Sequence, residues 1–220
     1  MDETLKLMYT GEYNRWIHRP GADKLLEWLE TTDFFSAPAS TRFHLTRDGG
    51  LMEHSLHVYE RLRTLFMREF TNGVLPTPEQ DESIAICGLL HDVCKANVYQ
   101  QEPKNHKTYD PEKIAAAEPW QIKHDKLGDF IWEMVMGYRF EDDLPYGHGE
   151  KSVYIISGFM RLSREEAMAI RWHMGFSDND FKAGGFTVGN AFEKYPLALL
   201  THIADLQATY LDEAEGTGKG

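Results

Sequence analysis

Residues Ile84-Ala85-Ile86-Cys87-Gly88-Leu89-Leu90-His91-Asp92-Val93-Cys94-Lys95 form an apolar run that ends in ionisable side chains. Apolar residues at positions 86, 89, 90 and 93 follow helical spacing, which predicts a buried or half-buried helix. Burying an imidazole and a carboxylate costs free energy unless their charge is compensated. A single cation bound by both His91 and Asp92 would compensate it. A helix would also place Lys95 on their face. An isolated His-Asp pair can equally be a chance feature of a helix end, so the interpretation depends on the rest of the chain.

The composition fits one domain that is large enough to bury a hydrophobic core. The chain has 220 residues, and 35 acidic against 23 basic residues give a formal net charge of −12. No basic run is long enough to follow a phosphate backbone, which argues against stable binding of extended nucleic acid. A small anionic substrate remains compatible, because a metal ion and one or two cations can reverse the field inside a cleft.

The two cysteines and the apolar segments indicate in which cellular compartment the protein is expected. Cys87 and Cys94 have neither the spacing of a CxxC redox pair nor that of a zinc ribbon, so we expect reduced thiols. The first residues show no basic segment followed by an apolar signal core, and no stretch approaches the ~20 apolar residues of a membrane span. These features predict a cytoplasmic protein without a membrane partner.

The hydrophobic pattern predicts a mainly helical, all-α bundle that forms a single domain over residues 1–220. Helices are expected over residues 22–31, from Gly49-Gly50 through Phe66, from Glu79 or Asp81 through Lys95, from His148, from a capping box at Ser163 and Glu166, and from Pro196 through Leu211. The segment 176–189 is expected to be a mobile loop. The final EAEGTGKG is expected to fray, with disorder over residues 214–220.

The helical pattern stops between residues 97 and 147, where four prolines interrupt the chain. Residues 129–140 (DFIWEMVMGYRF) are aromatic and β-prone, which predicts a strand or a hairpin arm. An excursion of this length is long for a plain connection. We therefore expect a small irregular or β-hairpin insertion around residues 97–147, near the site, as a lid or recognition surface.

An ionisable residue on or beside an apolar helical stripe recurs in five segments of the chain. These residues are His54, His91 with Asp92, His148, His173 and Asp205. A lone histidine in such a position is more often a satisfied core residue than a ligand. Together, however, four imidazoles and two carboxylates are enough for a two-metal centre with open positions for water and substrate. Glu53 and His57 flank His54 and could orient it, although exposed positions on the helix surface explain both more simply.

In the order of these motifs, the sequence resembles the HD-domain metal-dependent phosphohydrolase superfamily, in its uncharacterised bacterial hydrolase-like branch. The resemblance covers roughly residues 20–213. It rests on GGLMEHS (49–55), LLHDVCK (89–95), GHGEKS (147–152), WHMG (172–175) and HIAD (202–205). The ordered set is specific even though each member is common.

The resemblance implies a set of metal ligands. His54, His91, Asp92 and Asp205 would hold a first ion, and Asp92 would bridge to a second ion that is also held by His148 and His173. Some members of the superfamily carry a second histidine where this chain has Met174, and single-metal branches would leave His148 and His173 to contact phosphate. One or two divalent transition ions are therefore expected, and Mn, Fe, Co, Ni and Zn are all compatible with His and Asp ligands.

The expected reaction is hydrolysis of a small nucleotide or related phosphoester by metal-activated water. Asp92 and Lys95 are the candidate catalytic residues, and Lys95 could instead merely pair with Asp92. Lys95, Lys151 and Arg171 are the candidate phosphate contacts, although exposed cations on helices are usually only solvated. The alternatives are an HD-type phosphodiesterase or 3′-to-5′ exonuclease, a di-iron oxygenase, and a non-catalytic nucleotide-sensing module.

Overall fold

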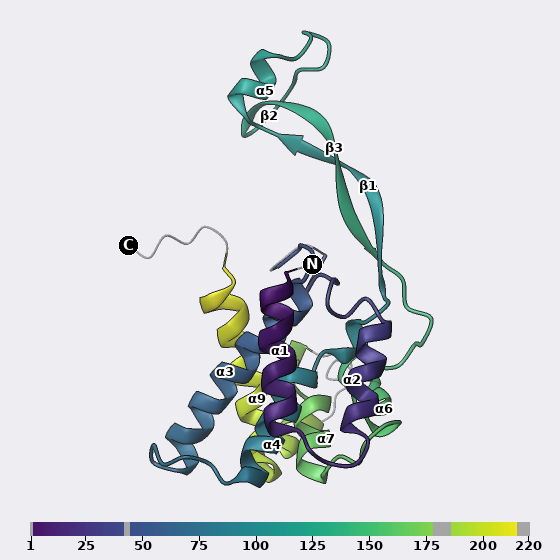
Figure 1. The fold of residues 1–220 in the computed structure, drawn as a ribbon. Helices are drawn as coiled ribbons and strands as arrows, with labels where there is room; N and C mark the ends of the chain where they lie inside the picture. The colour runs from purple at the N-terminus through teal and green to yellow at the C-terminus, as the bar shows by residue number, and fades with distance from the viewer. Residues whose placement is uncertain (1, 42–44, 178–185, 215–220) are drawn as a thin grey trace. The chain divides into compact units, whose positions relative to one another are not determined.

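The computed structural model describes residues 2–41, 45–177 and 186–214 of the chain. The fold is mainly helical with a small antiparallel sheet, which confirms the predicted fold class (Figure 1). Contacts within the chain define two compact units, residues 1–98 with 142–220, and residues 99–141. A location of the second unit near the site stays a prediction. In the described part of the chain, every helix is too short or too polar to cross a membrane.

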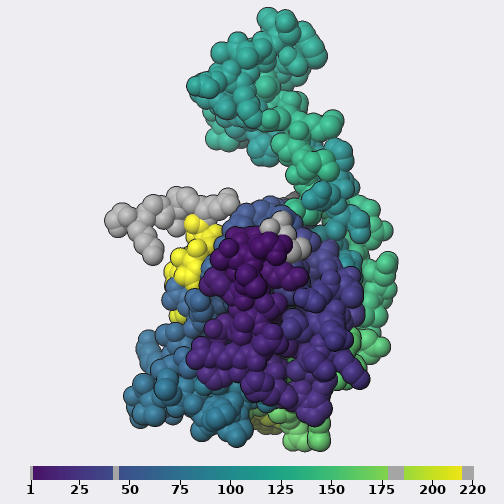
Figure 2. Space-filling model, in the orientation of Figure 1, coloured from purple at the N-terminus to yellow at the C-terminus, as the bar shows by residue number. Residues whose placement is uncertain are grey.

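The first unit is a bundle in which α3 packs against both α4 and α9, and α7 packs against α9. Figure 2 shows α1 and α2 covering one face of this unit. Its α-helices are α1 (Glu3–Trp16), α2 (Ala22–Thr31), α3 (Gly50–Phe70), α4 (Pro78–Leu90), α6 (His148–Ser157), α7 (Arg164–Arg171), α8 (Thr187–Lys194) and α9 (Pro196–Gln207). Shorter turns are η1 (Val93–Lys95), η2 (Gly175–Ser177) and η4 (Ala208–Asp212).

The helix α4 is the apolar run that dominates the sequence, and residues 84–90 are all buried. A capping box of Thr77 and Gln80 starts the helix, with Pro78 in its first turn, slightly earlier than predicted. Gly88 allows α4 to approach α3 closely, because a Cβ at this position would lie 2.5 Å from the Cα of Tyr59. The small residue therefore sets the distance between the two helices that carry His54 and His91.

The α-helix does not continue to Lys95 as predicted but ends at Leu90. His91 terminates it, and its Nδ1 donates to the carbonyl of Gly88 at 2.9 Å. This bond satisfies a carbonyl that a longer helix would have used. The tighter 3₁₀ turn η1 follows, in which the Lys95 amide donates to the carbonyl of Asp92. The Lys95 ammonium consequently lies 2.6 Å from the Asp92 carboxylate.

The C-terminal region differs from the sequence prediction in two places. Helix α9 passes into the π-helical turn η4, after which Glu213 has a fully buried side chain and is not frayed. Thr187 starts α8, inside the segment that was predicted to be a loop. Residues 178–185 of that loop and 215–220 of the predicted disordered tail lie outside the described residues.

The second unit is a three-stranded antiparallel sheet with the strand order β1-β3-β2 and a short helix. Its elements are β1 (Tyr99–Thr108), α5 (Pro111–Ala115), β2 (Lys123–Asp125) and β3 (Gly128–Phe140). The long ribbon of β1 and β3 pairs Tyr99 with Phe140 at one end and Thr108 with Ile131 at the other. The strand predicted over residues 129–140 is confirmed.

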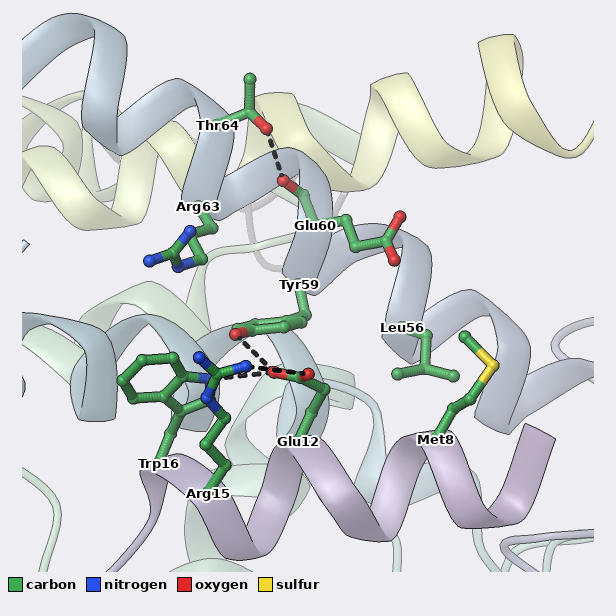
Figure 3. A pocket seen from close by; sticks show the side chains of 9 residues that line it. All are labelled: Met8, Glu12, Arg15, Trp16, Leu56, Tyr59, Glu60, Arg63 and Thr64. Atoms are coloured by element: carbon green, nitrogen blue, oxygen red, sulfur yellow. Dashed lines mark hydrogen bonds and ion pairs between the residues drawn. The ribbon is translucent and has the colours of Figure 1, made fainter. Parts of the chain in front are cut away.

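A pocket of about 490 Å³ lies between α1 and α3 (Figure 3). At its centre, Glu12 accepts hydrogen bonds from the indole of Trp16 at 2.8 Å and the hydroxyl of Tyr59 at 3.0 Å. Arg15 and Arg63 both lie over the Trp16 ring. These polar groups satisfy one another, and the lining contains none of the candidate metal ligands, so the pocket belongs to the packing of α1 on α3.

Candidate metal centre

His54 lies at the N-terminal end of α3 on its buried face. The glycine pair before it allows the chain to enter this helix. Gly49 adopts a left-handed φ of 76°, and a Cβ on Gly50 would lie 2.1 Å from the carbonyl oxygen of Leu45. The close approach places the first turns of α3 against the preceding loop and directs His54 inward.

The remaining candidate ligands come from the ends of α4, α6 and α7 and from the last turn of α9. His91 and Asp92 follow α4, and His148 is the first residue of α6. Gly149 lets this end of α6 approach α7, because its Cβ would lie 2.3 Å from the carbonyl oxygen of Arg171. His173 lies two residues after the end of α7, so the same close approach brings His148 and His173 together, with ring centroids 5.1 Å apart.

Asp92 lies at the centre of the cluster, with its two carboxylate oxygens facing different partners. Its Oδ1 is 2.8 Å from Nε2 of His148 and 3.3 Å from Nε2 of His173. Its Oδ2 is 2.6 Å from the ammonium of Lys95, 3.5 Å from Nε2 of His91 and 3.7 Å from Nε2 of His54. One carboxylate therefore touches two adjacent groups of imidazoles.

A second carboxylate approaches the cluster from α9. Asp205 lies 3.2 Å from Nε2 of His54, which is itself 3.3 Å from Nε2 of His91. The structure thus brings the six predicted ligands together. Three overlapping groups have donor atoms close enough to hold an ion: His54, His91 and Asp205; His91, Asp92 and His173; and Asp92, Cys94 and His148.

The donor atoms fit a metal ion. Nδ1 of His91 and Nδ1 of His173 donate to the carbonyls of Gly88 and Ile170, so the neutral rings direct Nε2 lone pairs into the cluster. Nε2 of His173 is buried without a hydrogen bond. Two nitrogens bound to one ion lie about 3.0–3.4 Å apart at ordinary coordination angles, and the His54–His91 separation falls in this range. A cation would also give Nε2 of His173 the partner that it lacks in the described part of the chain.

Burial and neighbouring charges shift the pKa values of the cluster in different directions. Burial lowers the pKa of His91 to about 3, so this ring is neutral near pH 7. Burial also lowers the pKa of His54, but Asp205 and Glu213 outweigh it and raise the value to about 9. Burial would raise the pKa of Asp92, yet Lys95 and the neighbouring imidazoles hold it well below its usual range. A metal ion must therefore compete with a proton at His54 and not at His91.

A cleft of about 460 Å³ opens onto the cluster, and its lining includes His54, Asp92, Lys95, His202 and Asp205. Lys151 and Arg171, the other two predicted phosphate contacts, are buried and do not belong to this lining in the described part of the chain. Lys151 binds Asp142, and Arg171 binds Glu150 at 2.9 Å. Their role in substrate binding stays a prediction, whereas Lys95 lies at the cleft.

Glu213 is the main site residue that the sequence did not indicate. Its buried carboxylate lies 3.0 Å from Nδ1 of His54 and 2.9 Å from Nδ1 of His57. The spacing of the two histidines, three residues apart on one helix, was the available signal that they share a partner. His202 was also missed as a contact residue: its Nδ1 donates to the backbone carbonyl of His173 at 2.6 Å.

Comparison with known protein families agrees with this geometry. The family model of the HD domain matches residues 51–214, a segment that contains all six candidate ligands and Glu213. The chain belongs to the HD-domain family. The HD domain implies the metal-dependent phosphohydrolase family, and the buried His and Asp cluster of this chain is consistent with that chemistry. Searches of curated proteins and of solved structures found no match.

Proposed function

We propose that this HD domain hydrolyses a phosphoester or phosphoanhydride bond in a small nucleotide or a related compound. The observation that carries the proposal is the position of Asp92, whose two oxygens face two groups of imidazoles. The residues on the two sides of Asp92 would hold two ions. Phosphoryl transfer commonly uses such pairs, since two ions can clamp the attacking and leaving oxygens.

The proposed ligands divide between the two oxygens of Asp92. His54, His91 and Asp205 would complete the first site with Oδ2, and His148 and His173 would complete the second with Oδ1. A bound Mn, Fe, Co, Ni or Zn ion would supply a water of lowered pKa and neutralise phosphoryl oxygens. With His148 and His173 left free, the same residues could instead bind the phosphate of the substrate.

Lys95 is the proposed phosphate-binding cation. Its side chain is 14% exposed, lies at the cleft and contacts Asp92. From there an ammonium can donate a hydrogen bond to a phosphoryl oxygen whose charge grows in the transition state. Lys151 and Arg171 would have to leave Asp142 and Glu150 to do the same. We therefore assign them a lesser part in binding phosphate.

The dimensions and charge of the protein favour a small substrate. The cleft volume of about 460 Å³ falls within the ~300–1,000 Å³ of typical small-molecule sites. The net charge of −12 opposes binding of an extended polyanion, whereas a compact phosphate can be held locally by metal ions and Lys95. A nucleotide or a related phosphoester satisfies both conditions.

The first test is elemental analysis of protein purified without chelator, followed by phosphate release from a panel of nucleotides and phosphodiesters. We expect one or two transition-metal ions per chain and metal-dependent turnover. Asp92→Asn keeps the shape of the side chain but removes its charge, and it should abolish both. His106→Ala, in an exposed histidine of β1, is the control. Full activity of Asp92→Asn would refute the proposal.

Two outcomes of the same experiment would favour other functions. Bound iron with oxygen uptake on candidate substrates would indicate an oxygenase. Tight nucleotide binding without turnover under every metal tested would indicate a sensing module.

A further variant tests the assignment of the ligands. Loss of only one of two ions in His148→Ala would assign His148 to the second metal site.

A further inference from the structure

One face of the β1–β3 ribbon is apolar over most of its length. Side chains alternate along a strand, so the residues of β3 that share this face are Phe130, Trp132, Met134, Met136, Tyr138 and Phe140. The pairing register adds Tyr99, Gln101, Pro103 and Asn105 from β1. Between the Tyr99–Phe140 pair and the Asn105–Met134 pair, every side chain on this face is uncharged. We call this uncharged stretch, together with Trp132, the methionine face.

The opposite face of the ribbon is polar and internally paired. Glu102 lies 3.3 Å from Arg139 and 3.7 Å from Lys104, and Lys113 binds Glu133 at 2.7 Å. The ribbon is therefore amphipathic: apart from Lys107, which lies beside Trp132, the charges of its paired residues are on one side, and the methionines and aromatic rings of β3 are on the other. An antiparallel sheet normally has this pattern when its apolar side packs against something.

The methionine face is exposed in the single chain. The exposed fractions are 53% for Trp132, 72% for Met134, 62% for Met136 and 57% for Phe140. A two-stranded ribbon is marginally stable unless its apolar face is covered. Absence of charge together with enrichment in Met and aromatic residues is the composition of an interface core.

We propose that the methionine face is a dimer interface, in which two copies of this chain pack their ribbons against each other. In a two-fold antiparallel arrangement centred near Val135, Met134 of one copy lies opposite Met136 of the other, and Trp132 lies opposite Tyr138. Lys107, which is paired with Trp132 in the register, then faces the neutral Gln101. Along β3, apolar groups therefore meet apolar groups, and along β1 no two like charges face each other, so the face is complementary to itself.

The charge distribution favours a dimer in which the two ribbon units contact each other, and not one in which the two helical units do. Residues 99–141 contain eight acidic and six basic residues, a net charge of −2, which leaves −10 of the total −12 on the remainder. Two helical units would repel each other, whereas two ribbons would bring little net charge together. The area is also sufficient. Partial burial of these large side chains gives on the order of 1,200 Å² for both copies, at the lower end of specific interfaces.

The test is the oligomeric state, and it does not depend on the metal centre. Sedimentation velocity from about 1 to 100 μM should reveal a reversible dimer, since weak and transient complexes lie at the lower end of interface sizes. The double substitution Met134→Glu with Met136→Glu would bring like charges together across the two-fold axis and should produce a monomer. Val135→Glu, on the opposite face of the same strand, is the matched control and should remain dimeric.

A cross-linking experiment keeps the proposal testable if the glutamate variant fails to fold. Mixed Met134→Cys and Met136→Cys chains should form a disulfide-linked dimer under mild oxidation, whereas Val135→Cys should not. A wild-type monomer over the whole concentration range would overturn the proposal. Dimers that persist in the folded double glutamate variant would overturn it equally, since they would have to use another surface.

Discussion

The carboxylate of Glu213 receives hydrogen bonds from Nδ1 of both His54 and His57, although 159 residues separate Glu213 from His54. A carboxylate only accepts, so both rings donate through Nδ1, which leaves Nε2 of His54, facing His91 and Asp205, as the atom that would bind a metal ion once its proton is displaced. Carboxylates placed in this way fix the orientation of a metal-binding imidazole and raise its basicity. The C-terminal segment therefore takes part in shaping the candidate centre.

Glu213→Ala should weaken metal binding by about 10- to 100-fold, the usual effect of removing such a partner. Glu213→Gln should weaken it less, because the amide oxygen can still accept from His54. Competition with a chelating indicator at neutral pH measures both. Asp212→Asn is the control, since its carboxylate pairs with Arg61 and not with the histidines. Equal affinities of wild type and Glu213→Ala would contradict the orienting role.

The helical fold and the set of candidate ligands were accessible from sequence because their signals are local. A 3.6-residue period marks α3, α4 and α9, and each candidate ligand lies on or beside an apolar stripe. The exact end of α4 was not accessible. It depends on the His91 ring donating to the Gly88 carbonyl, a choice that periodicity does not encode.

The missing parts of the prediction depend on contacts between distant segments. Glu213 follows the last apolar stripe, and its burial can be explained only once α3 and the C-terminal turn η4 are adjacent.

Strand β1 could not be predicted from its own sequence either. Its sequence contains Pro103 and several charges, which are unfavourable in isolated strands. It becomes a strand because β3 offers a long partner.

Lys95→Ala should lower kcat by about 10²-fold while metal content stays unchanged, if the ammonium stabilises transition-state charge. Lys95→Arg should recover part of the activity because it restores a cation at the cleft. Steady-state kinetics and elemental analysis of the same preparations measure the two properties. Loss of metal in parallel with activity would instead show that Lys95 mainly compensates the charge of Asp92, with which it is in contact.

Gly88→Ala should destabilise the protein by about 1–3 kcal/mol or more, as expected for overpacking between two helices. The added Cβ would lie 2.5 Å from the Tyr59 backbone, so α3 and α4 would have to separate. Gly11→Ala is the matched control in α1, where a Cβ meets nothing within 4 Å. It should be neutral or stabilising by up to about 1 kcal/mol. Urea unfolding compares them, and equal stabilities would contradict the close helix contact.

Acid should destabilise the wild type partly through Glu166, a carboxylate that is only 1% exposed. Burial raises its pKa, but hydrogen bonds from Arg19, at 2.7 and 2.9 Å, and Ser83, at 2.7 Å, outweigh burial and lower the pKa below its ordinary 4.5. Because the folded-state pKa is the lower one, this stabilisation is present above pH 4.5 and is lost as the pH falls through the folded-state value.

Glu166→Gln should therefore lower the free energy of unfolding at neutral pH and flatten its decline below pH 4.5. We expect a loss of about 3 kcal/mol, the lower end for a broken buried pair, because Glu82 still binds Arg19. Urea unfolding at a series of pH values measures both quantities. Glu27→Gln, on an exposed part of α2, should leave the curve unchanged. If Glu166→Gln lost stability equally at every pH, the contribution would come from packing and not from the ionised carboxylate.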